Sequence, residues 1–467
     1  MDLDEASYAA IACRLLDGGL PYRDGVENKF PLIFYTYKSI FALFGRYDMH
    51  AIHLAVTLSA ILTALVCGRI ARRFAGERAQ FWTTLFYIVY SASFYPKMLA
   101  GNTEMFAVLP SALAMWCYLE AREGHPWLFL PAGLFGGVTL LFKQVAGATF
   151  AALGADRALE MLRTRSILKP TRDSILLLIG FCIAVGAVAL HLRSIGVWDD
   201  AYFWTWTYAL RHYIPSGTKD HGFAFHLLTS FAPFLLLVSP ALIPAIARAR
   251  RSELLSIWIW FGATMTAALI GGRMYGHYFL LMLPALSTLG GIGAATWLSD
   301  DARRRKILTG ALAFTATGFF VFACLYDGSS GSFWSPSPDY RPPAEYVRAH
   351  TIPTDRIFVW GWYPTYYVAT DRCPSTRFVY TIILSGGTAS GGTALGHNVP
   401  EGWAMLMNDL ERDPPSYIVD TSTGDYSFPF PMQNYPALWN FVSSRYRHET
   451  TLEGVSLYRR VEKVAVR

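Results

Sequence analysis

Charged residues are scarce in this chain: Asp, Glu, Lys and Arg make up 16% of its 467 residues, whereas about a quarter is usual in a soluble protein. This scarcity excludes an ordinary soluble globular protein. Apolar residues are abundant instead, at 53%, and the mean hydropathy is positive, at +0.28. They are concentrated in blocks of about 16–25 residues, which as helices cross a hydrocarbon core about 30 Å thick. The composition predicts a polytopic α-helical membrane protein.

Recognisable cysteine patterns are also lacking, since the six cysteines show neither metal-ligand spacing nor a disulfide framework. They are Cys13, Cys67, Cys117, Cys182, Cys324 and Cys373. Four lie in apolar blocks, where we expect them to pack as small hydrophobic side chains. Cys13 and Cys373 could share a compartment, but the sequence favours leaving them unbridged.

No secretory signal peptide is visible, because the chain starts with the acidic stretch MDLDE rather than with basic residues before an apolar stretch. The net charge of +6 does not indicate a nucleic-acid partner. The basic residues form short clusters between apolar blocks, where a membrane protein places its cytoplasmic loops.

About ten spanning helices are predicted, at 50–69, 79–96, 104–121, 127–142, 144–160, 174–192, 223–247, 254–271, 277–298 and 307–325. Counted in order, they place four basic stretches on one side, namely 69–78, 157–172, 248–251 and 302–306. The positive-inside rule makes that side cytoplasmic, so both termini lie outside. Either the N-terminal tail crosses unaided or a first helix precedes this start, and we favour the second.

Composition divides the chain into four parts: an extracytoplasmic catalytic loop (1–48), a transmembrane domain (49–326), a linker (327–342) and a periplasmic α/β domain (343–467). Residues 30–45 are apolar on one face, but Lys38 interrupts them and they are too short to span. We therefore expect an interfacial helix there. The loop at 193–222 is crowded with aromatic residues that suit the headgroup layer.

Alternating patterns beyond residue 343 predict the small α/β domain. Strands are expected at 356–362, 375–380, 416–420 and 454–460, with helices near 343–351, 400–411 and 436–447. The glycine-rich stretch 383–393 lacks the Lys-Ser/Thr ending of a phosphate loop. We interpret it as a flexible loop near a ligand or the membrane.

Three carboxylates open the chain, at Asp2, Asp4 and Glu5. In one interpretation Asp4 simply caps a helix that starts at Glu5, since Asp is a favoured N-cap. In the other, Asp4 with Asp2 or Glu5 is a general base or a divalent-cation ligand. The two interpretations are compatible.

Further candidates are found in two loops. Glu27 and Lys29 lie in PYRDGVENKFPL (21–32), which is either a solvated surface loop or a point-charge site for a lipid phosphate. Asn102 and Glu104 lie where a span begins. A carboxylate near the membrane edge is costly unless solvated or paired, so Glu104 is a functional candidate.

Cationic candidates occur at two other places. Lys143 lies at an outer hairpin, where snorkelling explains it nearly as well as function does. Arg273 and His277 are four residues apart, so on a helix they share a face, with Tyr278 beside them. They could clamp a phosphate, or they could be an interfacial anchor.

Together these residues place acids and cations at one membrane face. Such a set fits glycosyl transfer from a lipid-phosphate sugar, because an acid can activate a hydroxyl and cations can stabilise a leaving phosphate. A transporter or flippase for lipid-linked sugars is the alternative from another class, and it would need charges at mid-membrane between symmetric halves. A non-catalytic assembly protein is a third.

The chain resembles the bacterial integral-membrane (type C) glycosyltransferases, the superfamily of the protein O-mannosyltransferases, the lipid A aminoarabinose transferases and the lipopolysaccharide-core galacturonosyltransferases. Six stretches carry the resemblance: DLDEASY (2–8), LLDGGLPYRDGVENKFPL (15–32), FALFGRY (41–47), MLAGNTEMFAVLP (98–110), LLFKQVAG (140–147) and GHYFLLMLPAL (276–286). The acidic opening with its tyrosine and the following Lys-x-Pro loop are the most specific.

The resemblance implies a polyprenyl-phosphate sugar donor, a lipid, glycan or protein acceptor, and inverting transfer on the periplasmic side of the inner membrane. It implies catalytic roles for Asp4, Glu5 and Glu104. Substrate-binding roles are expected for Tyr8, Glu27, Lys29, Asn102, Lys143, Arg273, His277 and Tyr278. Members differ in needing a divalent cation such as Mg or Mn, for which Asp2 and Asp4 are the candidate ligands.

Overall fold

The computed structural model describes residues 2–93, 100–165, 168–213, 252–270, 275–298, 302–325, 339–385, 399–424 and 430–461. Five sequence predictions lie wholly or mostly outside these residues: the span at 223–247, the basic stretch 248–251, the role of Arg273, the linker at 327–342 and the glycine-rich stretch 383–393.

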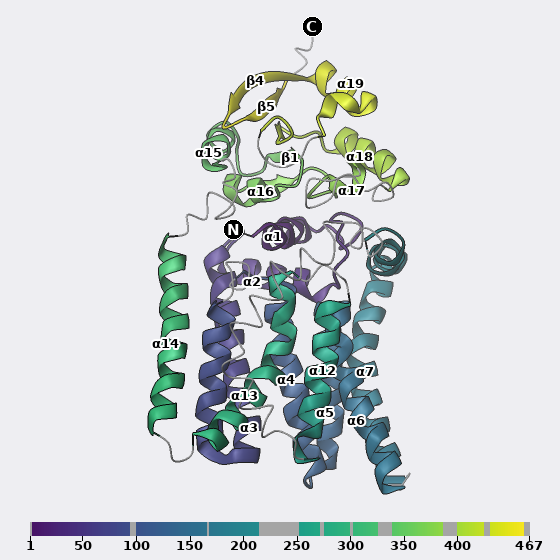
Figure 1. The fold of residues 1–467 in the computed structure, drawn as a ribbon. Coiled ribbons are helices and arrows are strands. Elements are labelled where there is room, and N and C mark those ends of the chain that lie inside the picture. Colours follow the sequence, from purple (N-terminus) through teal and green to yellow (C-terminus); the bar gives the residue numbers. More distant parts are fainter. Residues whose placement is uncertain are drawn as a thin grey trace.

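A bundle of long helices forms one half of the molecule (Figure 1). Its helices are α3 (Met49–Ser93), α4 (Thr103–Arg122), α5 (Phe129–Phe142), α6 (Ala148–Thr164), α7 (Leu168–Ser194), α12 (Leu255–Leu269), α13 (Leu283–Trp297) and α14 (Ala302–Leu325). Within the described residues, three segments qualify as membrane spans by length and apolar composition: Met49–Ala92, Pro170–Ser194 and Gly276–Trp297. The membrane-protein class is confirmed, whereas the count of ten spans stays a prediction.

Helix α3 contains two of the predicted spans and the basic stretch between them. Its course is broken at Ala75 and Gly76, where Gly76 adopts a φ of 71° that a residue without a Cβ tolerates. The two halves pack against each other, and Thr84 Oγ1 donates a hydrogen bond to the Ala64 carbonyl (3.3 Å). The turn lies at the end of the bundle farthest from the outer domain (Figure 1).

Two shorter helices, α1 (Leu3–Leu16) and α2 (Leu32–Phe44), lie across the opposite end of the bundle (Figure 1). Helix α2 agrees with the helix predicted at 30–45. The cap predicted for α1 is wrong: Asp2, not Asp4, is the N-cap, and Glu5 completes a capping box with it. Asp2 can serve there because Leu3 already has helical geometry, which leaves Asp4 inside the first turn.

The C-terminal part folds as an α/β domain against α1 (Figure 1). Its strands are β1 (Arg356–Trp360), β2 (Cys373–Pro374), β3 (Tyr417–Asp420), β4 (Tyr446–Leu452) and β5 (Val455–Arg460). The strand order is β2-β1-β3-β5-β4, with β2, β1 and β3 parallel and the β4–β5 hairpin antiparallel.

The helices of this domain are α15 (Arg341–Ala349), α16 (Thr365–Thr370), α17 (Ile382–Ser385), α18 (Pro400–Arg412) and α19 (Pro436–Arg445). Three of them fall where the sequence predicted helices. Strand β4 was missed, and the predicted strand at 375–380 is wrong. The Ser375 N–H still donates to the Ile357 carbonyl of β1 (2.9 Å), but beyond it the segment leaves the sheet, and the Arg377 carbonyl accepts from the Val26 N–H of the N-terminal loop (2.9 Å).

A disulfide between Cys13 and Cys373 joins α1 to β2, with their Cα atoms 5.8 Å apart. The sequence-based preference for two unbridged thiols is therefore wrong. The two cysteines are 360 residues apart in the chain, and only the packing of the C-terminal domain on α1 brings them together. One continuous apolar core includes Tyr8 of α1 and Tyr366 and Tyr367 of α16.

Candidate functional site

The first turn of α1 is anchored to the bundle through Glu5, which is 2% exposed. Its Oε2 accepts from the Gly101 N–H (2.9 Å) and lies 3.1 Å from His53 Nε2, while Oε1 accepts from the Asp2 N–H (2.9 Å). Burial raises the pKa of Glu5, but these hydrogen bonds outweigh burial and hold that pKa below its ordinary value. Both oxygens are occupied, so the geometry favours an anchoring role over the predicted catalytic one.

Residue 101 at this anchor must be a glycine, because there is no space for a side chain. Its carbonyl accepts from the Tyr37 hydroxyl (2.8 Å), and a Cβ on Gly101 would collide with that same hydroxyl oxygen. The loop before α4 therefore lies directly against α1 and α2.

Asp4 lies on the turn that Glu5 anchors, close to Tyr8 one turn further on. Burial raises the pKa of the Tyr8 phenol well above its ordinary value. The negative charges of Asp4, Glu27 and Glu104 raise it further. Three carboxylates from separate parts of the sequence thus act electrostatically on one buried phenol.

The loop between α1 and α2 is folded on itself. Tyr22 has a φ of 65°, its N–H donates to the Gly25 carbonyl (2.9 Å), and its hydroxyl donates to the Lys29 carbonyl (2.8 Å). Gln144 Nε2 donates to the Asn28 carbonyl (2.7 Å). The backbone of residues 28 and 29 is thereby fixed from two sides.

Glu27 and Lys29 lie together in this loop. Glu27 is buried, and its Oε1 accepts from the Asn28 N–H (2.8 Å) and lies 3.9 Å from Lys29 Nζ. The ammonium of Lys29 also donates to Asn28 Oδ1 (2.9 Å) and stays partly exposed. Burial and the nearby charge of Asp4 raise the pKa of Glu27, against the opposing effect of Lys29.

A second ion pair lies below the loop, at the end of α4. Glu104 is 1% exposed and pairs with Lys143, which lies between α5 and the short 3₁₀ helix Gln144–Gly147. His277 Nε2 is 3.8 Å from Glu104 Oε1, and Lys143 Nζ lies 3.7 Å from the ring centre of Tyr278. The structure thus brings these four sequence candidates into one cluster.

Asn102 is the backbone N-cap of α4 and is 1% exposed, but its side chain makes no capping hydrogen bond. Gln144, which follows Lys143, links the Glu104 cluster to the loop of Glu27 and Lys29 through its bond to the Asn28 carbonyl (2.7 Å). Arg273 lies outside the described residues. The predicted site residues that the structure describes therefore gather at one end of the bundle.

Sequence reasoning missed Tyr380, whose hydroxyl donates to Glu27 Oε2 (2.9 Å) from the C-terminal domain. It also missed Asn28, Gln144 and His53. Asn28 and Gln144 lie in two of the stretches that carry the resemblance, at 15–32 and 140–147. No local motif marks Tyr380 or His53.

The predicted cation ligands Asp2 and Asp4 both lie at the start of α1. Asp2 Oδ1 accepts from the Asp4 N–H (3.0 Å) as part of the helix cap. Within the described ranges, no three His, Cys, Asp or Glu side chains gather as metal ligands would. A role of these two carboxylates toward a divalent cation stays a prediction.

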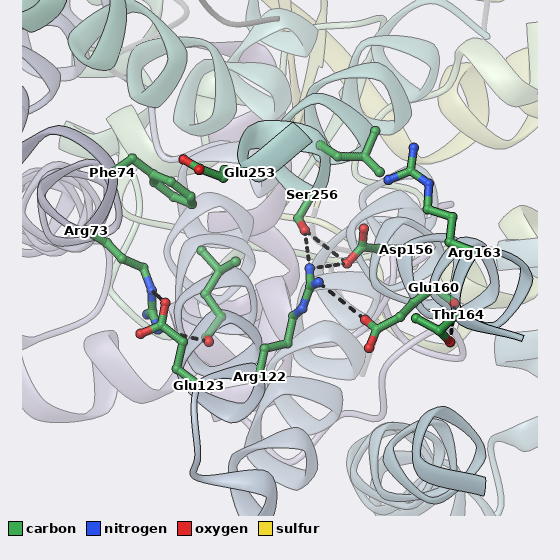
Figure 2. A pocket seen from close by; sticks show the side chains of 12 residues that line it. Arg73, Phe74, Arg122, Glu123, Asp156, Glu160, Arg163, Thr164, Glu253 and Ser256 are labelled. Atoms are coloured by element: carbon green, nitrogen blue, oxygen red, sulfur yellow. Dashed lines mark hydrogen bonds and ion pairs between the residues drawn. The ribbon is translucent and has the colours of Figure 1, made fainter. Parts of the chain in front are cut away.

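A cavity of about 620 Å³ lies at the other end of the bundle, between α3, α4, α6 and α12 (Figure 2). Asp156 Oδ2 accepts from Arg122 Nη1 (2.9 Å) and from Ser256 Oγ (3.0 Å). Arg73 pairs with Glu120 (2.8 Å) and with Glu123. The charges of these residues are balanced within the protein, which is typical of a structural network.

The chain shares its fold with solved structures of ArnT, a likeness that agrees with the resemblance in the sequence. More particularly, residues 28–190, about a third of the chain, match the dolichyl-phosphate-mannose-protein mannosyltransferase family. The matched range includes Lys29, Glu104 and Lys143 and leaves out Asp4 and Glu27. No curated protein sequence matches the chain.

Solved structures share the fold over nearly the whole chain. ArnT from Cupriavidus metallidurans in the apo state is 16% identical, with a TM-score of 0.62 over 98% of this chain and 93% of that chain. ArnT bound to undecaprenyl phosphate is 16% identical, with a TM-score of 0.60 over 99% and 94%. The apo oligosaccharyltransferase of Archaeoglobus fulgidus is 12% identical, with a TM-score of 0.50 over 99% and 71%.

Proposed function

We propose that the chain transfers a sugar from a polyprenyl-phosphate donor to an acceptor hydroxyl, with inversion at the anomeric carbon. The observation that supports this most is a set of contacts at the end of the bundle where α1 carries Asp4: Glu27 pairs with Lys29, Glu104 pairs with Lys143, and Gln144 joins the two pairs through the Asn28 carbonyl. The same fold in ArnT binds undecaprenyl phosphate, which supports a polyprenyl phosphate as the carrier here.

In the proposed reaction Asp4 accepts the proton of the acceptor hydroxyl, whose oxygen forms the new bond to the anomeric carbon. The bond between that carbon and the phosphate oxygen breaks, and the polyprenyl phosphate leaves with the bonding electrons. Lys29 lies beside the departing anion and stabilises its negative charge electrostatically. A general base in such a role contributes about 10²–10⁴ in rate.

The remaining polar residues position Asp4 and Lys29. Glu104 is fully occupied by Lys143 and Thr103, so we assign it to holding Lys143 and His277 rather than to contacting the sugar. Glu5 holds the first turn of α1 against Gly101. Both assignments refine the catalytic roles expected from the sequence.

We place this end of the bundle outside the cytoplasm, facing the periplasm of a bacterial inner membrane. The turn of α3 and the start of α14, which carry two of the basic stretches, lie at the opposite end (Figure 1). The Cys13–Cys373 disulfide supports the same orientation, because disulfides persist in oxidising compartments.

The test is Asp4→Asn in the full chain, assayed for release of polyprenyl phosphate from a lipid-linked sugar in membranes. We expect release to fall by about 10²-fold or more while the apparent Tm in detergent is unchanged. Asp48→Asn is the matched control, since Asp48 caps α3 by accepting from the Ala51 N–H (3.0 Å). Near-normal release by the Asp4→Asn chain would reject the assignment, and translocation without release would indicate a flippase.

A further inference from the structure

The C-terminal domain reaches the proposed site through residues 372–380, which we call the strap. The strap begins with β2 and continues without regular structure. At its first end the strap is fixed to α1 and to the start of α3. Cys373 is disulfide-bonded to Cys13, and Arg14 Nη1 donates to the Pro374 carbonyl (3.1 Å). The Tyr47 hydroxyl donates to the Arg372 carbonyl (3.2 Å).

The middle of the strap is fixed from both sides. The Arg377 carbonyl accepts from the Val26 N–H (2.9 Å), which ties it to the N-terminal loop. The Arg377 guanidinium forms a two-point ion pair with Asp409 of α18, at 2.8 and 2.9 Å, and Asp409 also accepts from the Arg377 N–H. Such a bidentate pair restrains the direction as well as the position of the chain.

Tyr380 forms the last tie. Its ring stacks on Trp362, which follows β1, with the ring centres 5.1 Å apart. The next residue, Thr381, is held through its N–H to the Gly361 carbonyl (2.9 Å). The ring is therefore placed by the α/β domain, while its hydroxyl reaches Glu27 at 2.9 Å.

The contact with Glu27 continues toward Lys29. Glu27 has one oxygen on the Tyr380 hydroxyl and the other on the Asn28 N–H. The Asn28 side chain in turn receives the Lys29 ammonium (2.9 Å). Displacement of the Glu27 carboxylate would therefore move the residues that orient the Lys29 ammonium.

We propose that Tyr380 is a positioning residue of the polyprenyl-phosphate site, through which the α/β domain holds Glu27 and thereby directs Lys29 at the phosphate. The identity of the ligand in this inference, a polyprenyl phosphate, rests on the proposed function. It makes the C-terminal domain a part of the site rather than a separate module.

The experiment measures the Kd of the detergent-purified full chain for undecaprenyl phosphate. Tyr380→Phe keeps the stacked ring and removes the hydroxyl, and we expect it to raise the Kd about tenfold, the effect of losing one hydrogen bond to a charged group. Tyr446→Phe is the matched control, because Tyr446 is buried in the same domain. Its hydroxyl donates to the Pro415 carbonyl (2.9 Å) and not to Glu27. The control should bind as the wild type does.

Glu27→Gln provides the second variant. If Tyr380 acts through Glu27, adding Tyr380→Phe to Glu27→Gln should change the Kd by less than about twofold. In turnover, Tyr380→Phe should raise the KM for the donor and leave kcat within about threefold. A structural loss would instead lower the apparent Tm and the active fraction.

The outcomes separate the two proposals. Unchanged binding by Tyr380→Phe, equal losses in Tyr446→Phe, additive losses with Glu27→Gln, or an unfolded Tyr380→Phe chain would each overturn the role of Tyr380. A wild-type chain that does not bind undecaprenyl phosphate would overturn it too. Binding that depends on Tyr380 without any sugar transfer would uphold the positioning role and reject the proposed function.

Discussion

The two ends of the helical bundle both bury charged residues, but they do so differently. At the end near α2, Lys29 pairs with Glu27 of the loop after α1 and Lys143 pairs with Glu104 of α4. Tyr380 enters there from a second domain. At the other end, arginines meet carboxylates within helices of the bundle. Arg157, 2% exposed, donates to the Tyr118 hydroxyl (2.7 Å) and pairs with Glu160.

The difference follows from the chemistry of the two cations. An arginine has a planar fork of donors that saturates two or more acceptors, which suits a network that only holds helices together. A lysine is a compact point charge on a flexible stem, which suits a transient anion such as a departing phosphate. The comparison teaches that buried charge alone does not identify the functional end of this molecule.

The largest effect is expected at Lys29. Lys29→Met should lower kcat/KM for the lipid-linked donor by about 10²-fold, since one electrostatic contact to the developing anion is lost. Lys38→Met, nine residues along the chain on α2, is the matched control and should be close to wild type. Equal activity of the two variants would remove the functional distinction between the two ends.

A moderate effect on stability is expected at the opposite end. Asp156→Asn weakens a buried acceptor shared by Tyr118, Arg122 and Ser256, and should cost about 1–3 kcal/mol of unfolding free energy. The apparent Tm in detergent would fall while the KM for the donor stays unchanged. Glu123→Gln, an exposed position, should change neither quantity. A raised donor KM in the Asp156→Asn chain would mean that the arginine-rich end also serves the reaction.

The smallest effect is a pH dependence at Glu5. Because the folded-state pKa of Glu5 lies below its ordinary value of 4.5, its ionised form adds stability that is present above that value and is lost as the pH falls through the lowered folded pKa. Glu5→Gln should therefore lower the apparent Tm at pH 7 and differ less from wild type in acid. A difference that does not shrink on acidification would assign the anchor to packing rather than to charge.

Much of the site could be predicted because its residues carry local signals. Carboxylates at the start of α1, a charged loop between prolines and ionisable groups at the ends of apolar segments all stand out against their neighbours. The interpretation in which Asp4 caps α1 was nevertheless wrong, since Asp2 is the N-cap. The sequence pattern locates the start of a helix only to within about two residues, so it fits either aspartate.

The strap shows why the remaining part was missed. Residues 375–380 have the apolar and aromatic composition of a strand, yet only Ser375 bonds to β1, through its N–H to the Ile357 carbonyl (2.9 Å), and the Arg377 carbonyl bonds to the loop at Val26 instead. The Cys13–Cys373 pairing and the Tyr380–Glu27 bond likewise join residues more than 350 positions apart. No local pattern can encode a partner at that distance.

The sequence by itself determined that this chain is a membrane protein and the positions of many of its helices. It also determined which ionisable residues are too costly to bury near a membrane unless they are paired or functional. The tertiary structure alone decided which of those residues meet, that Glu5 and Glu104 are already satisfied, and that a tyrosine from the C-terminal domain completes the loop. The physical reason is that hydropathy and helix capping depend on neighbours along the chain, whereas the pairing of buried charges depends on partners brought together in space.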